Sequence, residues 1–230
     1  SMPIWLRDKL FQKKLLINEL KRHDENFNDD KKLYFSEHHL SHATSAFYPS
    51  PFKEAIVLTA DGVGEWATTT VAIGKDNKLE IIKEIHFPHS LGLLYSAFTY
   101  YAGFKVNSGE YKLMGLAPYG EPRYLKTIKN HIASFDDDGV IELNTDYFDF
   151  MTGSSMINEK FCDLFKAPIF DQDDGLGQRE MDIASSIQIF FQEAVQNIVK
   201  HAVKITECRN LVMAGGVALN CVVNGELLKN

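Results

Sequence analysis

Three histidines lie close together in residues 37–42, at His38, His39 and His42. His38 and His42 are four residues apart, so a helix would carry both imidazoles on one face, one turn apart. A pair with this spacing can bind one metal ion, as in the H-E-x-x-H motif of zinc proteases. Here the residue after the first histidine is His39 rather than glutamate, so the general base of that motif is absent. A further metal ligand would have to come from elsewhere in the chain.

Asp61 is the best local candidate for that ligand. It follows the apolar run 55–60, which predicts a buried strand, and open α/β sheets place ligand chemistry at the carboxyl ends of such strands. A lone histidine is usually a surface residue or a hydrogen-bonded core residue. Three together, beside a carboxylate at a strand end, favour a metal site over that alternative. His39 would point away from the other two and is expected to be structural.

Composition narrows the class of protein. The chain has 230 residues, is 45% hydrophobic and carries a net charge of -7, which is enough for a packed core in one large or two small domains. The acidic balance argues against a broad nucleic-acid surface. No apolar run approaches the roughly 20 residues of a membrane span, and no secretory signal is present. Three scattered cysteines without a C-x-x-C motif fit a reducing, cytoplasmic location. They are Cys162, Cys208 and Cys221.

The histidine segment has to be positioned by the elements around it. It predicts a helix that ends near Phe47, because the prolines within residues 48–51 cannot continue it. Ser36 is the expected N-cap, after a short strand at residues 33–35. Three strands are expected next, at residues 54–60, 66–73 and 79–86.

The middle of the chain leaves two questions open. Ser90 is the expected N-cap of a helix that runs to about Tyr101. Gly92, in its first turn, would either let a ligand approach the positive end of the helix or merely allow close helix packing. Glu110 and Lys112 stand between apolar neighbours, and would either form an ion pair or line a polar pocket.

The C-terminal part combines a long helix with a glycine junction. Apolar residues recur on one face of residues 180–201, which predicts an amphipathic helix packed on the core. A buried strand at residues 209–214 then leads through Gly215 and Gly216 into a final helix at residues 220–228. Such a junction suits a nucleotide, because the glycines clear space and the helix N-terminus offers N–H donors.

Four stretches of the chain together resemble one known family. They are residues 37–52 (EHHLSHATSAFYPSPF), 59–66 (TADGVGEW), 108–120 (SGEYKLMGLAPYG) and 214–225 (AGGVALNCVVNG). These stretches are similar to the motifs of the NodU/CmcH/TobZ O-carbamoyltransferases and occur in the family's order. The match extends over nearly everything from residue 33 onward.

The resemblance implies an α/β fold of the actin-like/Hsp70-like ATPase type, which is ribonuclease-H-like. The chain is expected to be an internal fragment that lacks both ends of the catalytic domain. Residues 1–32 would form an N-terminal helix, over about residues 3–22, and a charged linker, and residues 33–230 would be part of the catalytic domain. Residues 120–178 are expected to be an α+β insertion. Its aspartate clusters, at 136–139 and 171–175, lack the full calcium-loop pattern and are expected to be turns.

The resemblance also implies the chemistry. In this family a YrdC-like domain of the full-length chain makes carbamoyl adenylate from carbamoyl phosphate and ATP. The domain present here then passes the carbamoyl group to the hydroxyl of a small molecule, assisted by iron(II), zinc or manganese. The expected fragment would be inactive alone, no residue is assigned as a catalytic acid or base, and the resemblance leaves room for a homodimer.

Carried onto this sequence, the metal ligands fall on His38, His42 and Asp61, and a fourth, an aspartate, is expected beyond Asn230. The implied adenylate contacts are Gly92, Gly215, Gly216, Asn220 and Asn224.

Three alternatives stay open. A plain ATPase or sugar-kinase-like member of the same superfold would need no metal-binding histidines. A tRNA threonylcarbamoyl-type transferase would be expected to carry a basic surface, against which the net charge of -7 counts. A non-catalytic interaction module would bind neither nucleotide nor metal, so that neither would shift its melting temperature.

Overall fold

The computed structural model describes residues 11–27, 33–171 and 175–229, and divides into two units, Ser1–Ser36 and Glu37–Asn230. The first unit contains α2 (Gln12–His23), a helix with no buried residue. The described part of the expected helix over residues 3–22 is therefore helical from Gln12, whereas residues 3–10 and the end of the linker at 28–32 lie outside the described residues.

The strand expected at residues 33–35 is wrong. Residues 33–36 belong to no strand. The side chains of Tyr34 and Phe35 are exposed, so this short apolar run packs against no neighbouring strand. The helix that follows is α3 (His38–Phe47), and the residue at its N-cap position is Glu37 rather than Ser36.

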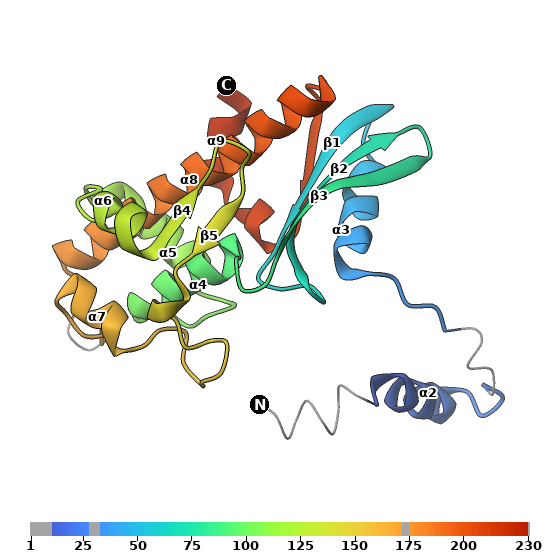
Figure 1. Ribbon diagram of the computed structural model, residues 1–230. Coiled ribbons are helices and arrows are strands. Elements are labelled where there is room, and N and C mark those ends of the chain that lie inside the picture. The colour runs from blue at the N-terminus through green and yellow to red at the C-terminus, as the bar shows by residue number, and fades with distance from the viewer. Residues whose placement is uncertain (1–10, 28–32, 172–174, 230) are drawn as a thin grey trace. The chain divides into compact units, whose positions relative to one another are not determined.

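The second unit is built on a mixed four-stranded sheet (Figure 1). Its strands are β1 (Glu54–Ala60), β2 (Ala67–Lys75), β3 (Lys78–His86) and β6 (Leu211–Ala214). They lie in the order β3-β2-β1-β6. The first three form an antiparallel meander, whereas β6 pairs parallel to β1. The predicted α/β class is confirmed, and the predicted strand over residues 54–60 coincides with β1.

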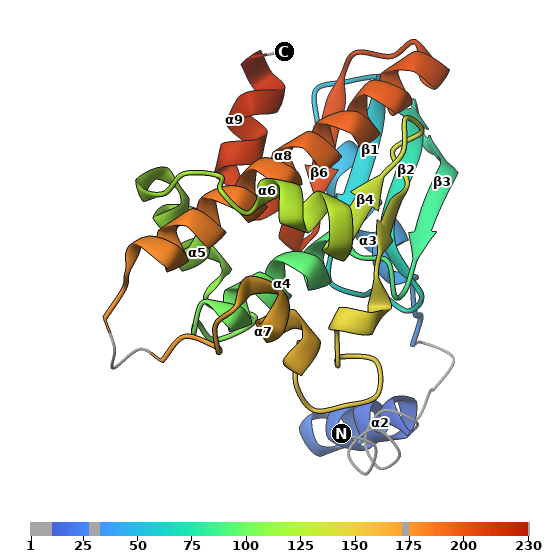
Figure 2. The same cartoon turned by 60° about the vertical axis from the view of Figure 1, so that its left-hand side comes forward.

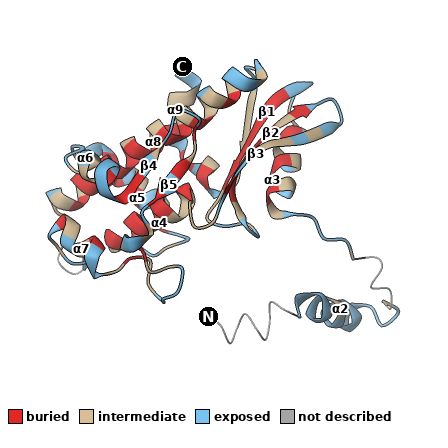
Figure 3. Cartoon of the chain, viewed as in Figure 1, coloured by how far each residue is buried: buried red, intermediate tan, exposed pale blue. Residues whose placement is uncertain are grey.

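Strand β1 is buried on both faces because helices cover the sheet on both sides (Figures 1 and 2). Side chains alternate between faces along a strand. Accordingly, Ala55 and Val57 pack with Phe47 of α3 on one face. Ile56 and Leu58 belong on the other face to the larger core cluster, which includes residues of α4 (Leu91–Tyr101) and α8 (Gln178–Thr206). Figure 3 shows this buried layer running through the sheet and the helices.

The remaining elements pack mainly around α8 and α4. The other helices of this unit are α5 (Glu110–Leu116), α6 (Leu125–Thr127), α7 (Glu159–Phe165) and α9 (Cys221–Lys229). Single 3-10 or π-helical turns lie at Ala117–Tyr119, Ile128–Ile132, Thr145–Tyr147 and Gly216–Leu219. A separate two-stranded sheet pairs β4 (Ala133–Phe135) with β5 (Ile141–Leu143). The described part of residues 120–178 is thus mixed helix and strand, and the origin of the segment as an insertion stays a prediction.

Two further expectations concern turns and membrane contact. The aspartate cluster at 136–139 is a turn in which Asp136 Oδ1 accepts hydrogen bonds from the backbone N–H groups of Asp138 and Val140. Of the second cluster, residues 172–174 lie outside the described part. Among the described residues, no helix combines the length and the apolar character that a bilayer span requires.

The loop of residues 117–123, which contains one glycine and two prolines, is held against the first turns of α8. Asp182 is buried, and its Oδ1 atom accepts hydrogen bonds from the Glu121 backbone N–H at 2.8 Å and from Gln178 Nε2 at 2.8 Å. Its Oδ2 atom lies 3.3 Å from Arg123 Nε. Burial acts to raise the pKa of Asp182, but the hydrogen bonds and the arginine outweigh it, so the pKa lies below its ordinary value. The loop therefore depends on an ionised carboxylate.

A carboxylate with a lowered pKa in the folded state adds stability above its unfolded pKa of about 3.9, and that stability is lost as the pH falls through the folded pKa. Replacing Asp182 by asparagine (Asp182→Asn) should therefore lower the urea midpoint at neutral pH. The gap to the wild-type chain should narrow as the pH falls from about 7 towards about 3. Urea unfolding curves over this range measure it, and a gap of constant size would show that the charge is not what holds the loop.

Candidate metal centre and its cavity

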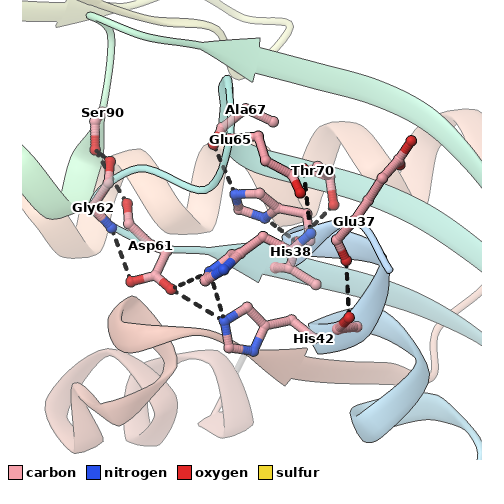
Figure 4. Close-up of polar contacts among 12 residues, drawn as sticks. Glu37, His38, His42, Asp61, Gly62, Glu65, Ala67, Thr70 and Ser90 are labelled. Atoms are coloured by element: carbon pink, nitrogen blue, oxygen red, sulfur yellow. Dashed lines mark hydrogen bonds and ion pairs between the residues drawn. The ribbon is translucent and has the colours of Figure 1, made fainter. Parts of the chain in front are cut away.

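The three residues named from the sequence as metal ligands meet at one point (Figure 4). Asp61 Oδ2 lies 3.0 Å from His38 Nε2 and 3.1 Å from His42 Nε2, and the two imidazole nitrogens are 3.1 Å apart. The four-residue spacing does place both rings on one face of α3. Asp61 follows directly after β1, so the group joins a helix to the end of a buried strand.

These distances fit a metal ion. Bonds of about 2.1 Å from an ion to nitrogen or oxygen place neighbouring ligand atoms about 3.0 Å apart in octahedral geometry and about 3.4 Å apart in tetrahedral geometry. The three observed separations are 3.0, 3.1 and 3.1 Å, which matches three atoms on one face of an octahedron. Two histidines and one carboxylate on one face are typical of non-haem iron(II) sites.

The carboxylate is oriented so that one oxygen faces the histidines. Asp61 Oδ1 accepts a hydrogen bond from the Gly62 backbone N–H at 2.9 Å, which leaves Oδ2 towards His38 and His42. Burial acts to raise the pKa of Asp61, but the hydrogen bonds with His38, Gly62 and His42 outweigh it and lower the pKa below its ordinary value. Asp61 is therefore ionised at neutral pH, as a metal ligand must be.

The third histidine has a structural role, as predicted. His39 is buried, and its Nε2 atom lies 2.9 Å from the carbonyl oxygen of Ala67. A carbonyl can only accept, so Nε2 donates and Nδ1 accepts from the hydroxyl of Thr59 at 2.7 Å. Burial lowers the pKa of His39, which keeps the ring neutral. These bonds fasten α3 to β1 and to the start of β2.

Glycines pack around Asp61, where side chains would collide. A Cβ atom on Gly92 would lie 2.5 Å from the carbonyl oxygen of Asp61, and one on Gly216 would lie 2.9 Å from Asp61 Oδ1. Gly215 has φ +93, and its Cβ would lie 2.3 Å from the Ala60 carbonyl oxygen. Close packing is thus sufficient to require glycine at position 92, which was one of the two alternatives.

A cavity of about 620 Å³ begins at this group, within the size range of small-molecule and cofactor sites. His38 and Asp61 line it and His42 does not. The polar lining residues are Tyr95, Ser96, Asn107, Ser108, Glu110, Tyr111 and Asn220. The other lining residues are Gly62, Val63, Gly92, Met114, Phe191, Gly216, Val217 and Leu219. Gly92 thus also faces the cavity. The structure is therefore compatible with both alternatives for this residue, close packing and ligand access.

Of the five residues predicted to contact a nucleotide, three line the cavity and two do not. Gly92, Gly216 and Asn220 are lining residues, whereas Gly215 and Asn224 are not. Asn224 Nδ2 instead donates to the Ala218 carbonyl oxygen at 2.8 Å, which closes the turn that precedes α9.

The structure decides whether Glu110 pairs with Lys112 or lines a polar pocket. Glu110 Oε1 accepts hydrogen bonds from Ser96 Oγ and from the Asn107 backbone N–H, each at 2.9 Å, and Oε2 accepts one from the Gly109 backbone N–H at 3.1 Å. Lys112 Nζ lies 6.0 Å from the ring centroid of Phe104. The pocket alternative therefore holds for Glu110, and the ion pair with Lys112 is wrong.

A buried network beneath the cavity was not predicted. The Tyr95 hydroxyl donates to Gln188 Oε1 at 2.8 Å, and the amides of Gln188 and Asn220 bond to each other reciprocally at 3.1 Å. Asn220 Oδ1 also accepts from the Val223 backbone N–H. Burial raises the pKa of Tyr95 far above its ordinary value, so the hydroxyl stays a donor. The available signal was Gln188, a polar residue within the apolar stripe of α8.

Comparison with known proteins identifies the family. The model of the family described as "Carbamoyltransferase N-terminus" matches residues 1–230. The chain belongs to this family. The resemblance in the four sequence stretches is thereby confirmed, and the histidine–aspartate group and its cavity lie within the residues that the family model matches.

Relatives of the chain are known from bacteria. It is 54% identical over its whole length to "Uncharacterized protein sll1178" of Synechocystis sp., of which it covers 37%. It is 32% identical over 88% of its length to "Nodulation protein NolNO" of Sinorhizobium fredii, of which it covers 28%. With "Nodulation protein NolO" of Bradyrhizobium diazoefficiens it shares 30% identity over 83% of its length and covers 33% of that protein. The chain thus spans about a third of the length of these relatives.

The packing of Gly92 against the Asp61 turn yields a prediction. Gly92→Ala should destabilise the chain by about 1–3 kcal/mol, because the new methyl group overlaps backbone atoms. It should also shift the imidazole signals of His38 and His42 in NMR spectra. The control is Gly225→Ala in α9, where a Cβ meets nothing within 4 Å, and which should stabilise by about 0.5–1 kcal/mol. Equal stability of the two variants would contradict the packing role.

Proposed function

We propose that this chain carries the transfer site of a carbamoyltransferase, which passes a carbamoyl group from carbamoyl adenylate to the hydroxyl of a small molecule. The observation that supports this most is the group of His38, His42 and Asp61 at one end of a cavity of about 620 Å³, in a chain that belongs to the carbamoyltransferase N-terminus family. In this reaction the acceptor oxygen bonds to the carbamoyl carbon. The bond between that carbon and the phosphate oxygen of the adenylate breaks. AMP leaves with the electron pair of this bond, and the proton of the acceptor hydroxyl is released.

We further propose that His38, His42 and Asp61 hold a divalent metal, iron(II) first and zinc or manganese as alternatives. Two imidazoles and one carboxylate suit all three ions, and they leave positions open for phosphate oxygens. A metal bound there would supply positive charge to the phosphate as negative charge develops on the leaving adenylate.

The protein's own residues would orient the adenylate. In this proposal Gly92 and Gly216 let the phosphate approach the backbone beside Asp61, because neither has a side chain to block it. Asn220 presents its amide edge to the cavity from the network with Gln188, while Gly215 and the turn closed by Asn224 hold that junction in place. Asp61 acts as a ligand rather than as a base, since Oδ2 faces both imidazoles and Oδ1 is engaged by the Gly62 N–H.

The finer fold assignment and the context of the reaction are also proposals. An actin-like/Hsp70-like fold is supported by the antiparallel meander that a parallel strand extends on the β1 side. We propose that the active protein is longer, that a YrdC-like domain supplies the adenylate from ATP and carbamoyl phosphate, and that the reaction is cytoplasmic. The three free cysteines fit that location.

Metal binding by the 230-residue chain tests the site. We expect one iron(II) ion to bind without oxygen at neutral pH, and the double variant His38→Ala/His42→Ala to bind more than about 100-fold more weakly, because most of the donor set is gone. The double variant His23→Ala/His86→Ala, which removes two exposed histidines, is the matched control and should bind as the wild-type chain does. Equal affinity in all three proteins would overturn the assignment of the ligands.

Carbamoyl transfer tests the role of Asp61 in a protein that contains this chain and a YrdC-like domain. Asp61→Asn should reduce metal affinity and transfer together, by about 100-fold or more, because the amide is a poor substitute for a ligating carboxylate. Transfer is followed as AMP release that depends on carbamoyl phosphate and on a hydroxyl acceptor. If the variant kept full metal affinity yet lost transfer, Asp61 would be a base and not a ligand. Metal-independent ATP hydrolysis without transfer would favour the plain ATPase alternative.

A further inference from the structure

Ser90 is a fully buried serine that bonds directly to the turn carrying Asp61 (Figure 4). Its single hydroxyl proton is shared between two acceptors, the carbonyl oxygen of Gly62 at 2.6 Å and that of Asp61 at 3.1 Å. The same Oγ atom accepts a hydrogen bond from the Leu93 backbone N–H at 3.0 Å, as the N-cap of α4.

The two roles of this hydroxyl are separable. Capping a helix needs only an acceptor, so any of several side chains could cap α4. Two carbonyl groups on a neighbouring turn need a donor, and a hydroxyl can serve as donor and acceptor at once. The contacts of Ser90 therefore exceed what helix capping explains.

Few other bonds hold the Asp61 turn. The Asp61 N–H donates to the Thr68 carbonyl at 2.9 Å, and the Gly64 N–H donates to the Ala67 carbonyl at 2.9 Å. Both bonds tie the turn to the start of β2. On the side of α4, the turn is held by the hydrogen bonds of Ser90 and by the close packing of Gly92.

We propose that Ser90 is a positioning residue for the metal ligand Asp61. Its hydroxyl holds the Asp61–Gly62 backbone so that Asp61 Oδ2 stays within ligand distance of His38 and His42. Helix α4 also contributes Gly92, Tyr95 and Ser96 to the cavity. The same hydroxyl therefore fixes the position of Asp61 relative to these cavity residues. This inference rests on the proposed metal role of Asp61.

A matched control serine lies elsewhere in the same chain. Ser186 of α8 is also fully buried. Its Oγ donates to the Asp182 carbonyl at 2.6 Å and accepts from the Tyr124 backbone N–H at 3.0 Å, and it does not line the cavity. Ser90→Ala and Ser186→Ala therefore remove the same buried hydroxyl at two different places. In both, the hydroxyl donates to backbone carbonyl oxygen, two for Ser90 and one for Ser186, and accepts from one backbone N–H.

The test measures Co²⁺ affinity by visible absorption and amide hydrogen exchange by mass spectrometry, on the 230-residue chain. Ser90→Ala should weaken Co²⁺ binding by about 10- to 100-fold, the range typical of residues that orient metal ligands. It should also speed exchange in residues 58–64 of the metal-free chain. Ser186→Ala should leave both unchanged, and Ser90→Thr, which keeps the hydroxyl, should retain most of the affinity.

Each outcome bears on one claim. If the wild-type chain binds Co²⁺ tightly and Ser90→Ala binds equally well, Ser90 does not position Asp61, whereas the metal site stands. Equal loss of affinity in Ser90→Ala and Ser186→Ala would show a general loss of stability and would likewise overturn the inference. If neither the wild-type chain nor a longer protein that contains it together with the ligand expected beyond Asn230 binds Co²⁺, the metal role itself is overturned, and with it the assignment of Ser90 to a metal ligand.

Discussion

The structure depends on an ionised carboxylate placed at the end of a strand that is buried on both faces. Strand β1 cannot shift along its axis without exposing Ile56 and Leu58 on one face, or Ala55 and Val57 on the other, because a shift of one residue exchanges the two faces. Helices α3 and α8 are packed on these faces, so the position of Asp61 is fixed by the core. Its charge is then stabilised by the histidines of α3 and by the Gly62 N–H.

Backbone packing around Asp61 explains why small residues gather there. The turn after β1 lies against the first turn of α4 and against the junction that follows β6, and each approach is closer than a Cβ atom permits. Gly92 and Gly215, whose Cβ atoms would meet backbone, are therefore required before any ligand is considered, and Gly216 faces the Oδ1 atom of Asp61. Gly92 and Gly216 leave no side chain beside Asp61, which is the room that the proposed phosphate would need.

The sequence predicted the elements whose pattern is local and missed those that depend on distant partners. The helical spacing of His38 and His42 and the apolar run before Asp61 were sufficient to predict that these three side chains meet. The strand expected at residues 33–35 failed because a short apolar run needs a neighbouring strand, which no local pattern reveals. The Tyr95–Gln188–Asn220 network joins residues up to 125 positions apart, so only the fold could place them in contact.

The three predicted ligands differ in whether they face the cavity. His38 and Asp61 line it, whereas His42 does not, although the His42 side chain is 31% exposed. A group bound in the cavity would therefore approach the predicted site from the side of His38 and Asp61. With the three ligand atoms on one face of an octahedron, the remaining positions of an ion would lie on the opposite face. The buried bonds of His39 fix the rotation of α3 about its axis. That rotation keeps His38 and His42 beside Asp61 Oδ2, and Asp61 lines the cavity together with Gly92, Ser96 and Asn220.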